Sequence, residues 1–278
     1  MGVSVLLALL SSLLWGTADF WGGTAAKKLH ALVVVGVSQA IALVVLVPLA
    51  LGFGEHIDHF WAGPAAGVTG LVGLGAFYAA LAGGTMGVIA PIAASGATVP
   101  VIVGLVRGES PSALQVAGIV VALLGVILAS GPELSGGASP RPLALAVVSA
   151  VCFGFVAVFV AEGSKGGEGA FVATLLVMRC TSVALLLLLA AVALKKPLGV
   201  GREDVPILTG AGLGDVAANA AFAVASRSGL LSVVAVLASL YPVVTVLLAR
   251  QIHHERLRGI QVLGAVGTLG GVALLASG

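Results

Sequence analysis

Charged residues are scarce in this sequence: Asp, Glu, Lys and Arg together make up 9% of its 278 residues, whereas hydrophobic residues make up 59%. A soluble domain carries about 25% charged residues, so this chain has too few to cover a water-facing surface. The chain also lacks a basic tract, which argues against a nucleic-acid-binding protein. We therefore expect an integral membrane protein whose formal net charge of +2 resides at the two membrane faces.

Groups that hold metals, disulfides or nucleotides are equally rare. Both cysteines, Cys152 and Cys180, fall inside apolar segments and are interpreted as small apolar fillers, with no redox motif around them. The stretch EHIDH at residues 55–59 has metal-ligating side chains, but we interpret it as an exposed polar turn. A phosphate-binding loop of the Gly-Lys-Ser/Thr kind is missing, which argues against an ATP-driven pump. We predict no metal and no cofactor.

Long apolar runs fill the chain instead. A hydrocarbon core accommodates about 20 apolar residues per helix, and these runs lack the period of two that a transmembrane barrel requires. The first run has no basic region before it, so we expect a retained helix rather than a cleaved signal. We predict ten transmembrane helices: Val3–Gly23, Ala31–Gly52, Trp61–Ala82, Gly87–Val106, Ala113–Ser130, Leu143–Glu162, Ala170–Leu194, Val205–Ser226, Leu230–Ala249 and Gly259–Ser277.

The sequence contains an internal repeat of one unit. Ser95–Gly118 and Ala238–Gly264 share an apolar run, a charged turn and a second apolar run with spaced glycines. One offset aligns Glu109 with Glu255, and we expect such an acid to cap or brace its turn. The predicted units are residues 1–131 and 143–278, joined by a linker at 132–142 that is rich in Gly, Pro and Ser. Since five helices per unit is an odd number, the second unit is inverted, as in many secondary transporters.

Two stretches resemble the EamA family of the drug/metabolite transporter superfamily: LLWGTADFWGG in the first helix and LYPVVTVLLARQIHHERLRGIQVLGAVGTLGGVALL at the end. Pro242 followed by Glu255, Gln261 and Gly264 is similar to the signature of that family's fourth and fifth helices. The first unit has Gly96 where the signature proline would stand. The resemblance implies ten helices in two inverted five-helix units, and carriage of small metabolites, often outward.

Ionisable side chains inside the apolar helices need a local reason, because a charge at the bilayer centre costs roughly 2.5–3.5 kcal/mol on insertion scales. Asp215, with Asn219 one turn later, is predicted to bind a substrate or a proton. The alternative is that Asp215 has a structural role and pairs with a neighbouring helix. Arg179 either binds a substrate carboxylate or forms a fixed ion pair with Asp215. Gln39 falls near Arg179 when the units are aligned, so the two halves offer unlike groups.

Three more residues complete the predicted substrate site. Asp19 follows Trp15 by one turn of the first helix, and it either faces the substrate or lies at the membrane interface as an acid near the helix end. Tyr241 precedes Pro242, whose missing N–H predicts a kink that exposes the tyrosine to substrate. Such a mixed site suits a small zwitterion such as an amino acid.

The sequence thus predicts a secondary transporter, not an enzyme, in the cytoplasmic membrane. We expect it to export a small polar or zwitterionic metabolite by alternating access, with or without proton coupling through Asp215, around a cavity lined by the first, third, fourth, sixth, eighth and ninth helices. Its partners would be that solute and the lipid bilayer, with no nucleic acid. The alternative is an intramembrane aspartyl protease, because Gly212–Asp215 reads GxGD. That chemistry needs a second aspartate close enough to share a proton, and Asp19 is the other intramembrane candidate.

The orientation in the membrane stays open. The positive-inside rule places both termini outside, whereas the family resemblance implies that both lie in the cytoplasm. Loops after odd-numbered helices hold nine basic residues and the remaining loops hold three: Lys27, Lys28, Arg141, Lys195, Lys196, Arg202, Arg250, Arg256 and Arg258 against Arg107, Lys165 and Arg227.

Overall fold

The computed structural model describes residues 2–53, 58–130, 140–167, 169–193, 199–253 and 259–277, and their regular structure is entirely helical. Eight helical segments in these ranges are long and apolar enough to cross a membrane, and a ninth apolar stretch, Ala113–Gly125, is shorter. The α-helices are α1 (Gly2–Ala26), α2 (Ala31–Phe53), α3 (Ala62–Gly83), α4 (Met86–Ala94), α5 (Thr98–Val106), α6 (Ala113–Ser130), α7 (Pro140–Gly163), α8 (Ala170–Ala193), α9 (Val205–Ser228), α10 (Leu231–Ala238), α11 (Tyr241–Ile252) and α12 (Gly259–Ser277).

Two of the predicted helices are each broken into two. A short 3₁₀ turn, η1 (Ser95–Ala97), separates α4 from α5, and Ser239–Leu240 separate α10 from α11. When each pair is counted once, the described residues form the ten helical segments that the sequence predicts. The expected mid-helix kink at Pro242 is instead a full break, and the proline lies in the first turn of α11, where its missing N–H has no helical partner to lose.

The break in the first unit has no proline at the equivalent position. A Cβ atom added to Gly96 would collide with the backbone carbonyl of Ala150 on α7, so η1 lies directly against that helix. The break in the second unit, before α11, makes the corresponding contact with α1. A Cβ at Gly16 of α1 would lie 2.5 Å from the carbonyl oxygen of Tyr241. Each unit's broken segment therefore crosses the first helix of the other unit at a glycine.

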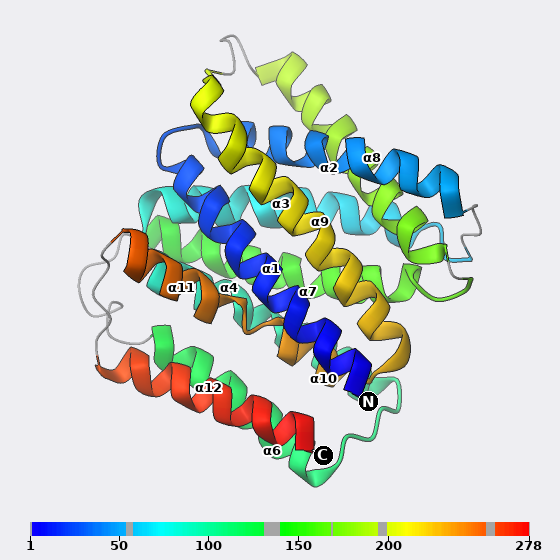
Figure 1. The fold of residues 1–278 in the computed structure, drawn as a ribbon, viewed down its shortest axis with the longest axis vertical. Coiled ribbons are helices and arrows are strands. Elements are labelled where there is room, and N and C mark those ends of the chain that lie inside the picture. Colours follow the sequence, from blue (N-terminus) through cyan, green and yellow to red (C-terminus); the bar gives the residue numbers. More distant parts are fainter. Residues whose placement is uncertain are drawn as a thin grey trace.

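The two units interlock. The first helix of one unit, α1, packs along α9, which is the third helix of the other, and α7 packs along α3 in the same way. The last helices, α6 and α12, pack side by side at one edge of the bundle, and both termini lie at the same end (Figure 1). The fold is thus an all-α membrane architecture of two inverted five-helix repeats.

Small residues set the helix spacing at several crossings, which is typical of membrane helices. A Cβ at Gly67 of α3 would lie 2.6 Å from the carbonyl oxygen of Met178 on α8. A Cβ at Gly214 of α9 would lie 3.0 Å from the Cβ of Ala18 on α1. Backbone atoms approach closely at these points, and this proximity supplies dispersion contacts in a lipid environment where apolar burial alone does little.

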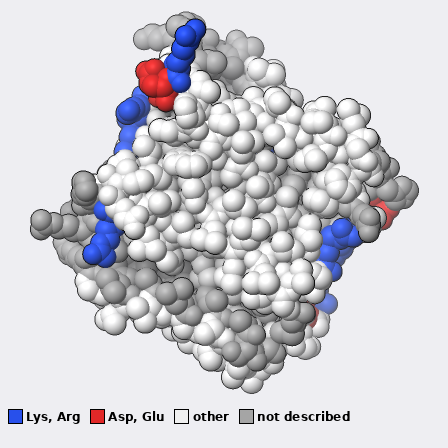
Figure 2. Space-filling model, viewed as in Figure 1, with Lys and Arg blue, Asp and Glu red and all other residues white. Residues whose placement is uncertain are grey.

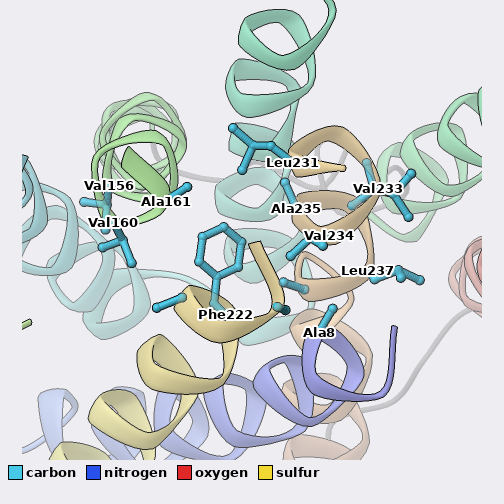
Figure 3. Packing of buried hydrophobic residues seen from close by; sticks show 14 of the residues in the cluster. Ala8, Val156, Val160, Ala161, Phe222, Leu231, Val233, Val234, Ala235 and Leu237 are labelled. Atoms are coloured by element: carbon cyan, nitrogen blue, oxygen red, sulfur yellow. The ribbon is translucent and has the colours of Figure 1, made fainter. Parts of the chain in front are cut away.

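Helix α10 is buried along its whole length, Leu231–Ala238. Its side chains belong to one buried cluster with Ala8 of α1, Phe222 of α9 and Val156 and Val160 of α7, and Phe222 lies between α10 and the two valines (Figure 3). Helices of both units, among them α1, α5 and α9, therefore close around α10.

The outer surface matches a membrane environment. Figure 2 shows a broad face whose centre carries uncharged residues, with Lys and Arg side chains gathered towards opposite edges. Large apolar side chains on the outside of the bundle, such as Val44, Leu187 and Leu188, are more than half exposed. An uncharged belt between two charged rims is the pattern of a multi-pass membrane protein.

Candidate functional site

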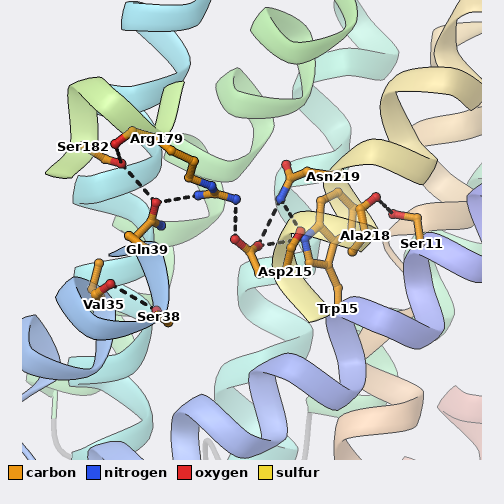
Figure 4. Close-up of polar contacts among 10 residues, drawn as sticks. All are labelled: Ser11, Trp15, Val35, Ser38, Gln39, Arg179, Ser182, Asp215, Ala218 and Asn219. Atoms are coloured by element: carbon orange, nitrogen blue, oxygen red, sulfur yellow. Dashed lines mark hydrogen bonds and ion pairs between the residues drawn. The ribbon is translucent and has the colours of Figure 1, made fainter. Parts of the chain in front are cut away.

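The centre of the bundle holds a buried polar network around Asp215 of α9 (Figure 4). Its carboxylate forms an ion pair with the guanidinium of Arg179 on α8. The indole Nε1 of Trp15 on α1 donates to Oδ1 of Asp215 at 3.1 Å, and the amide of Asn219 donates to the same oxygen at 3.0 Å. Three helices thus converge on one carboxylate, whose charge is compensated by one cation and two neutral donors.

Arg179 is fixed from a second direction. Its Nη1 donates to Oε1 of Gln39 on α2 at 2.7 Å, and the Ser182 hydroxyl donates to the same oxygen at 3.0 Å (Figure 4). The arginine is only 1% exposed. Of the two sequence-based hypotheses for Arg179, the structure contains the ion pair with Asp215. Gln39 and Arg179, which align between the repeats, are in direct contact.

A central cavity adjoins this network. The space free of protein atoms in this cavity is about 790 Å³, which includes the space at its open side. The rest of the wall is largely apolar and includes Leu74, Phe153 and Phe222. The six helices that the sequence predicts around the cavity all line it, and the second and seventh helices, α2 and α8, line it as well. All seven residues that the sequence predicts for the substrate site line this cavity: Trp15, Asp19, Gln39, Arg179, Asp215, Asn219 and Tyr241.

Three polar groups on the cavity wall lack a partner within the described residues. The Nε–H of Arg179 and the hydroxyl of Tyr241 are buried without a hydrogen bond. The carboxylate of Asp19, in a residue only 6% exposed, takes part in no hydrogen bond or ion pair there. Native structures pair most buried polar groups, so an unpaired one calls for an explanation. Two other unpaired buried atoms, His59 Nδ1 and Ser149 Oγ, do not line the cavity.

The position of Asp19 decides between its two predicted locations. The helix continues beyond it to Ala26, and Asp19 lies inside the bundle rather than at its rim. It is close enough to Asp215 for the two carboxyl groups to repel each other electrostatically. The interpretation of Asp19 as an interfacial acid is therefore wrong.

Aromatic side chains line the cavity beside the unpaired polar groups. The ring of Trp15 lies 6.5 Å from that of Tyr241 and 5.8 Å from that of Phe222, centroid to centroid. Tyr241 is held at the start of α11 by the break that follows α10. The other tyrosine, Tyr78, is also buried, but its ring packs against Gly22 and it does not line the cavity.

The GxGD motif has a packing role in this fold. A Cβ at Gly212 would lie 2.5 Å from the carbonyl oxygen of Ser38 on α2, and Gly214 packs against α1. Asp215 is bonded to a cation, and no hydrogen bond joins it to Asp19 among the described residues. The described contacts thus pair Asp215 with Arg179, Trp15 and Asn219 and not with Asp19.

Of the stretch EHIDH at residues 55–59, the structure describes only Asp58 and His59. In the part of the chain that the structure describes, no group of three His, Cys, Asp or Glu residues is placed to hold a metal ion. Residues 55–57 lie outside the described ranges, and His59 lies 3.6 Å from Glu162 of α7.

Glu109 caps a helix of the other unit, whereas the sequence predicts that such an acid caps or braces its own turn. Its Oε1 accepts a hydrogen bond from the backbone N–H of Leu231 at 2.6 Å, and its Oε2 accepts from the N–H and hydroxyl of Ser232 at 3.0 and 2.6 Å. A carboxylate from the first unit thus caps the positive N-terminus of α10 in the second unit. Its recurrence in both repeats was the signal in the sequence. The equivalent acid, Glu255, lies outside the described residues.

Two inverted, interlocking five-helix units around a central cavity define a membrane transporter architecture. The profile of the EamA-like transporter family matches residues 2–131 and again 141–277, and the chain belongs to this family. A solved structure titled "Crystal structure of protein" has the same fold: it superposes with a TM-score of 0.75 at 19% identity, over 98% of this chain and 95% of its own. Comparison with curated proteins gave no match.

Proposed function

We propose that this protein is a secondary transporter that exports a small zwitterionic, amino-acid-like metabolite across the cytoplasmic membrane by alternating access. The observation that carries the proposal is the set of unpaired groups on the cavity wall. Arg179 and Tyr241 offer N–H and O–H donors, and Asp19 offers a carboxylate. A ligand with one carboxylate and one ammonium group complements all three.

The ion pair between Arg179 and Asp215 narrows the choice of ligand. Because the charge of Arg179 is already balanced, the carboxyl group of Asp19 is the acid of the wall that has no partner among the described residues. A solute without an amine would leave that carboxyl group buried and unpaired, which is costly. The apolar walls, which include Leu74, Phe153 and Phe222, favour a solute that also carries an apolar group.

Alternating access requires each end of the bundle to open in turn. At the end that holds the termini, Glu162 of the second unit forms ion pairs with Arg107 of the first unit at 2.5 Å and with Lys165 at 2.9 Å. The side chains of Arg107 and Lys165 are 45% and 53% exposed and that of Glu162 is 11% exposed, and ion pairs whose cations are solvated contribute only about 0–1 kcal/mol. Such a contact links the units here yet costs little to break when this end opens.

The two tyrosines provide a matched test. Tyr241→Phe removes one hydroxyl from the cavity wall, and Tyr78→Phe removes one from the buried core outside it. Cells that express the wild type or Tyr78→Phe at equal membrane levels should enrich the same zwitterionic solute in spent medium. A hydrogen bond to a charged group contributes about 1.5–3 kcal/mol, so Tyr241→Phe should lower the apparent affinity about tenfold or more.

Two results would contradict this proposal. One is spent medium that the wild type leaves unchanged, together with reconstituted protein that exchanges no radiolabelled amino acid across sealed vesicles. The other is an equal loss of transport in both tyrosine variants, which would separate Tyr241 from the substrate path.

A further inference from the structure

The two carboxyl groups on the cavity wall have unlike surroundings. Asp215 accepts hydrogen bonds from Trp15 and Asn219 and pairs with Arg179, so its charge is satisfied in the empty protein. Asp19 has none of these partners, although it is 6% exposed. A buried carboxylate without donors is costly, whereas a protonated carboxyl is much less so. Asp19 is therefore the acid of the wall that is free to change its partner.

Within the described ranges, the helices packed against α1 supply no fixed cation for Asp19. It senses the charge of Asp215 on α9, while Tyr78 on α3 and Tyr241 on α11 sense its own charge. Residues of α2 and α10 that reach the cavity are not ionisable. Arg179 of α8 is also near, but it is bonded to Asp215 and Gln39. The other charged or titratable groups around α1 lie at helix ends. Arg250 is in the last turn of α11, His253 follows α11, and Lys27 follows α1.

His253 is the nearest of these outer groups with a defined contact. Its ring lies 5.2 Å from that of Phe20, the residue after Asp19, and its Nε2 lies 2.9 Å from the hydroxyl of Thr24. The contact with Thr24 occupies one ring nitrogen at the end of α1. On the cavity wall, Asp19 thus has one like charge, Asp215, and one neutral phenol, Tyr241, near it.

We propose that Asp19 is a shared site for a proton and for the ammonium group of the transported solute. The carboxyl holds a proton when the cavity is empty. When a solute with a protonated amine binds, the O–H bond breaks, the proton leaves to water, and the carboxylate pairs with the ammonium group. Each solute exported is thereby exchanged for one proton moving inward. This inference rests on the proposed function and transfers proton coupling from Asp215 to Asp19.

Calorimetry can count the protons directly. The probes share one carbon skeleton: leucine, 3-methylbutylamine, which lacks the carboxylate, and 4-methylpentanoate, which lacks the amine. Binding heats measured in two buffers with different ionisation enthalpies give the protons released per ligand. For the purified wild type we expect about one proton for leucine and for the amine at mildly acidic pH, by linkage. Binding of 4-methylpentanoate should be at least about tenfold weaker, since it leaves Asp19 unpaired.

Two acid-to-amide variants complete the design. Asp19→Asn should bind leucine at least about tenfold more weakly and release no proton. Glu203→Gln changes an exposed acid outside the cavity and should behave like the wild type. Thermal unfolding of each variant confirms that it is folded, and the wild-type proton count remains decisive on its own if Asp19→Asn does not fold.

The outcomes separate this inference from the proposed function. Leucine binding by the wild type without proton release, or equal proton release by Asp19→Asn, overturns the exchange at Asp19 and leaves the transporter proposal standing. Equal affinities for 4-methylpentanoate and 3-methylbutylamine overturn the assignment of the amine to Asp19. If folded wild type binds and transports none of a panel of zwitterions and amines, the proposed function fails together with the inference.

Discussion

The ion pair between Arg179 and Asp215 can be tested with a double-mutant cycle. Arg179→Gln and Asp215→Asn each remove one charge while keeping a side chain of similar size, and the double variant removes both. The side chains are 2% and 17% exposed, so either single substitution leaves the other charge in a site that is nearly dry. Breaking a buried pair by removing one partner costs about 3–5 kcal/mol.

The two single variants should not be equal. In Arg179→Gln, Asp215 keeps hydrogen bonds from Trp15 and Asn219, so the loss should lie near the lower limit of about 3 kcal/mol. In Asp215→Asn, the guanidinium keeps only its bond to Gln39, and the loss should approach about 5 kcal/mol. The double variant buries no charge and should be more stable than either single variant.

Reversible unfolding in mixed micelles of a mild detergent and dodecyl sulfate gives the four free energies of unfolding. The expected coupling energy is at least about 3 kcal/mol, because neutral replacements of a buried pair are often tolerated. Losses below about 1 kcal/mol in both single variants, or a double variant that loses the sum of the two, would refute the interpretation of the pair as a fixed link between α8 and α9.

Further predictions concern helix capping, packing and pH. Glu109→Gln removes the anionic cap of α10 and should lower the free energy of unfolding by about 2 kcal/mol. Gly154→Ala would place a Cβ 2.5 Å from the carbonyl oxygen of Gly96 and should cost about 1–3 kcal/mol, whereas Gly36→Ala meets no atom within 4 Å and should cause no loss. Burial and a nearby lysine lower the pKa of His253. The unfolded chain therefore binds its proton more readily, so stability should fall as pH drops below about 6.5, and His253→Gln should weaken that dependence in thermal unfolding.

Much of the fold could be predicted from the sequence because membrane helices are encoded locally. Apolar runs of sufficient length predict the helices, and the offset that aligns Glu109 with Glu255 predicts the two units. The helix breaks were harder to predict. The break at Ser95–Ala97 contains no proline and arises where Gly96 meets the backbone of α7, a contact between residues far apart in the chain.

The members of the candidate site were predictable, whereas their pairing was not. A charged or amide side chain inside an apolar helix stands out because of its insertion cost, which is how Asp19, Arg179 and Asp215 were found. Which acid pairs with Arg179 depends on how α1, α8 and α9 approach one another. The sequence favoured Asp215 for proton coupling, but among the described residues Asp215 has three partners and Asp19 has none.

The repeat also explains how the two halves come to present unlike groups to one cavity. A perfectly duplicated unit would present the same groups twice across the pseudo-twofold axis. Here Gln39 and Arg179, near-equivalent positions, bond to each other at 2.7 Å, so only one half contributes a cation. Aligning Trp15 with Phe153 places Asp19 opposite Ala157, and both line the cavity. Duplication thus supplies two matching scaffolds, which the proposed alternating access requires, and divergence at a few central positions gives the cavity the polarity that we propose a zwitterion recognises.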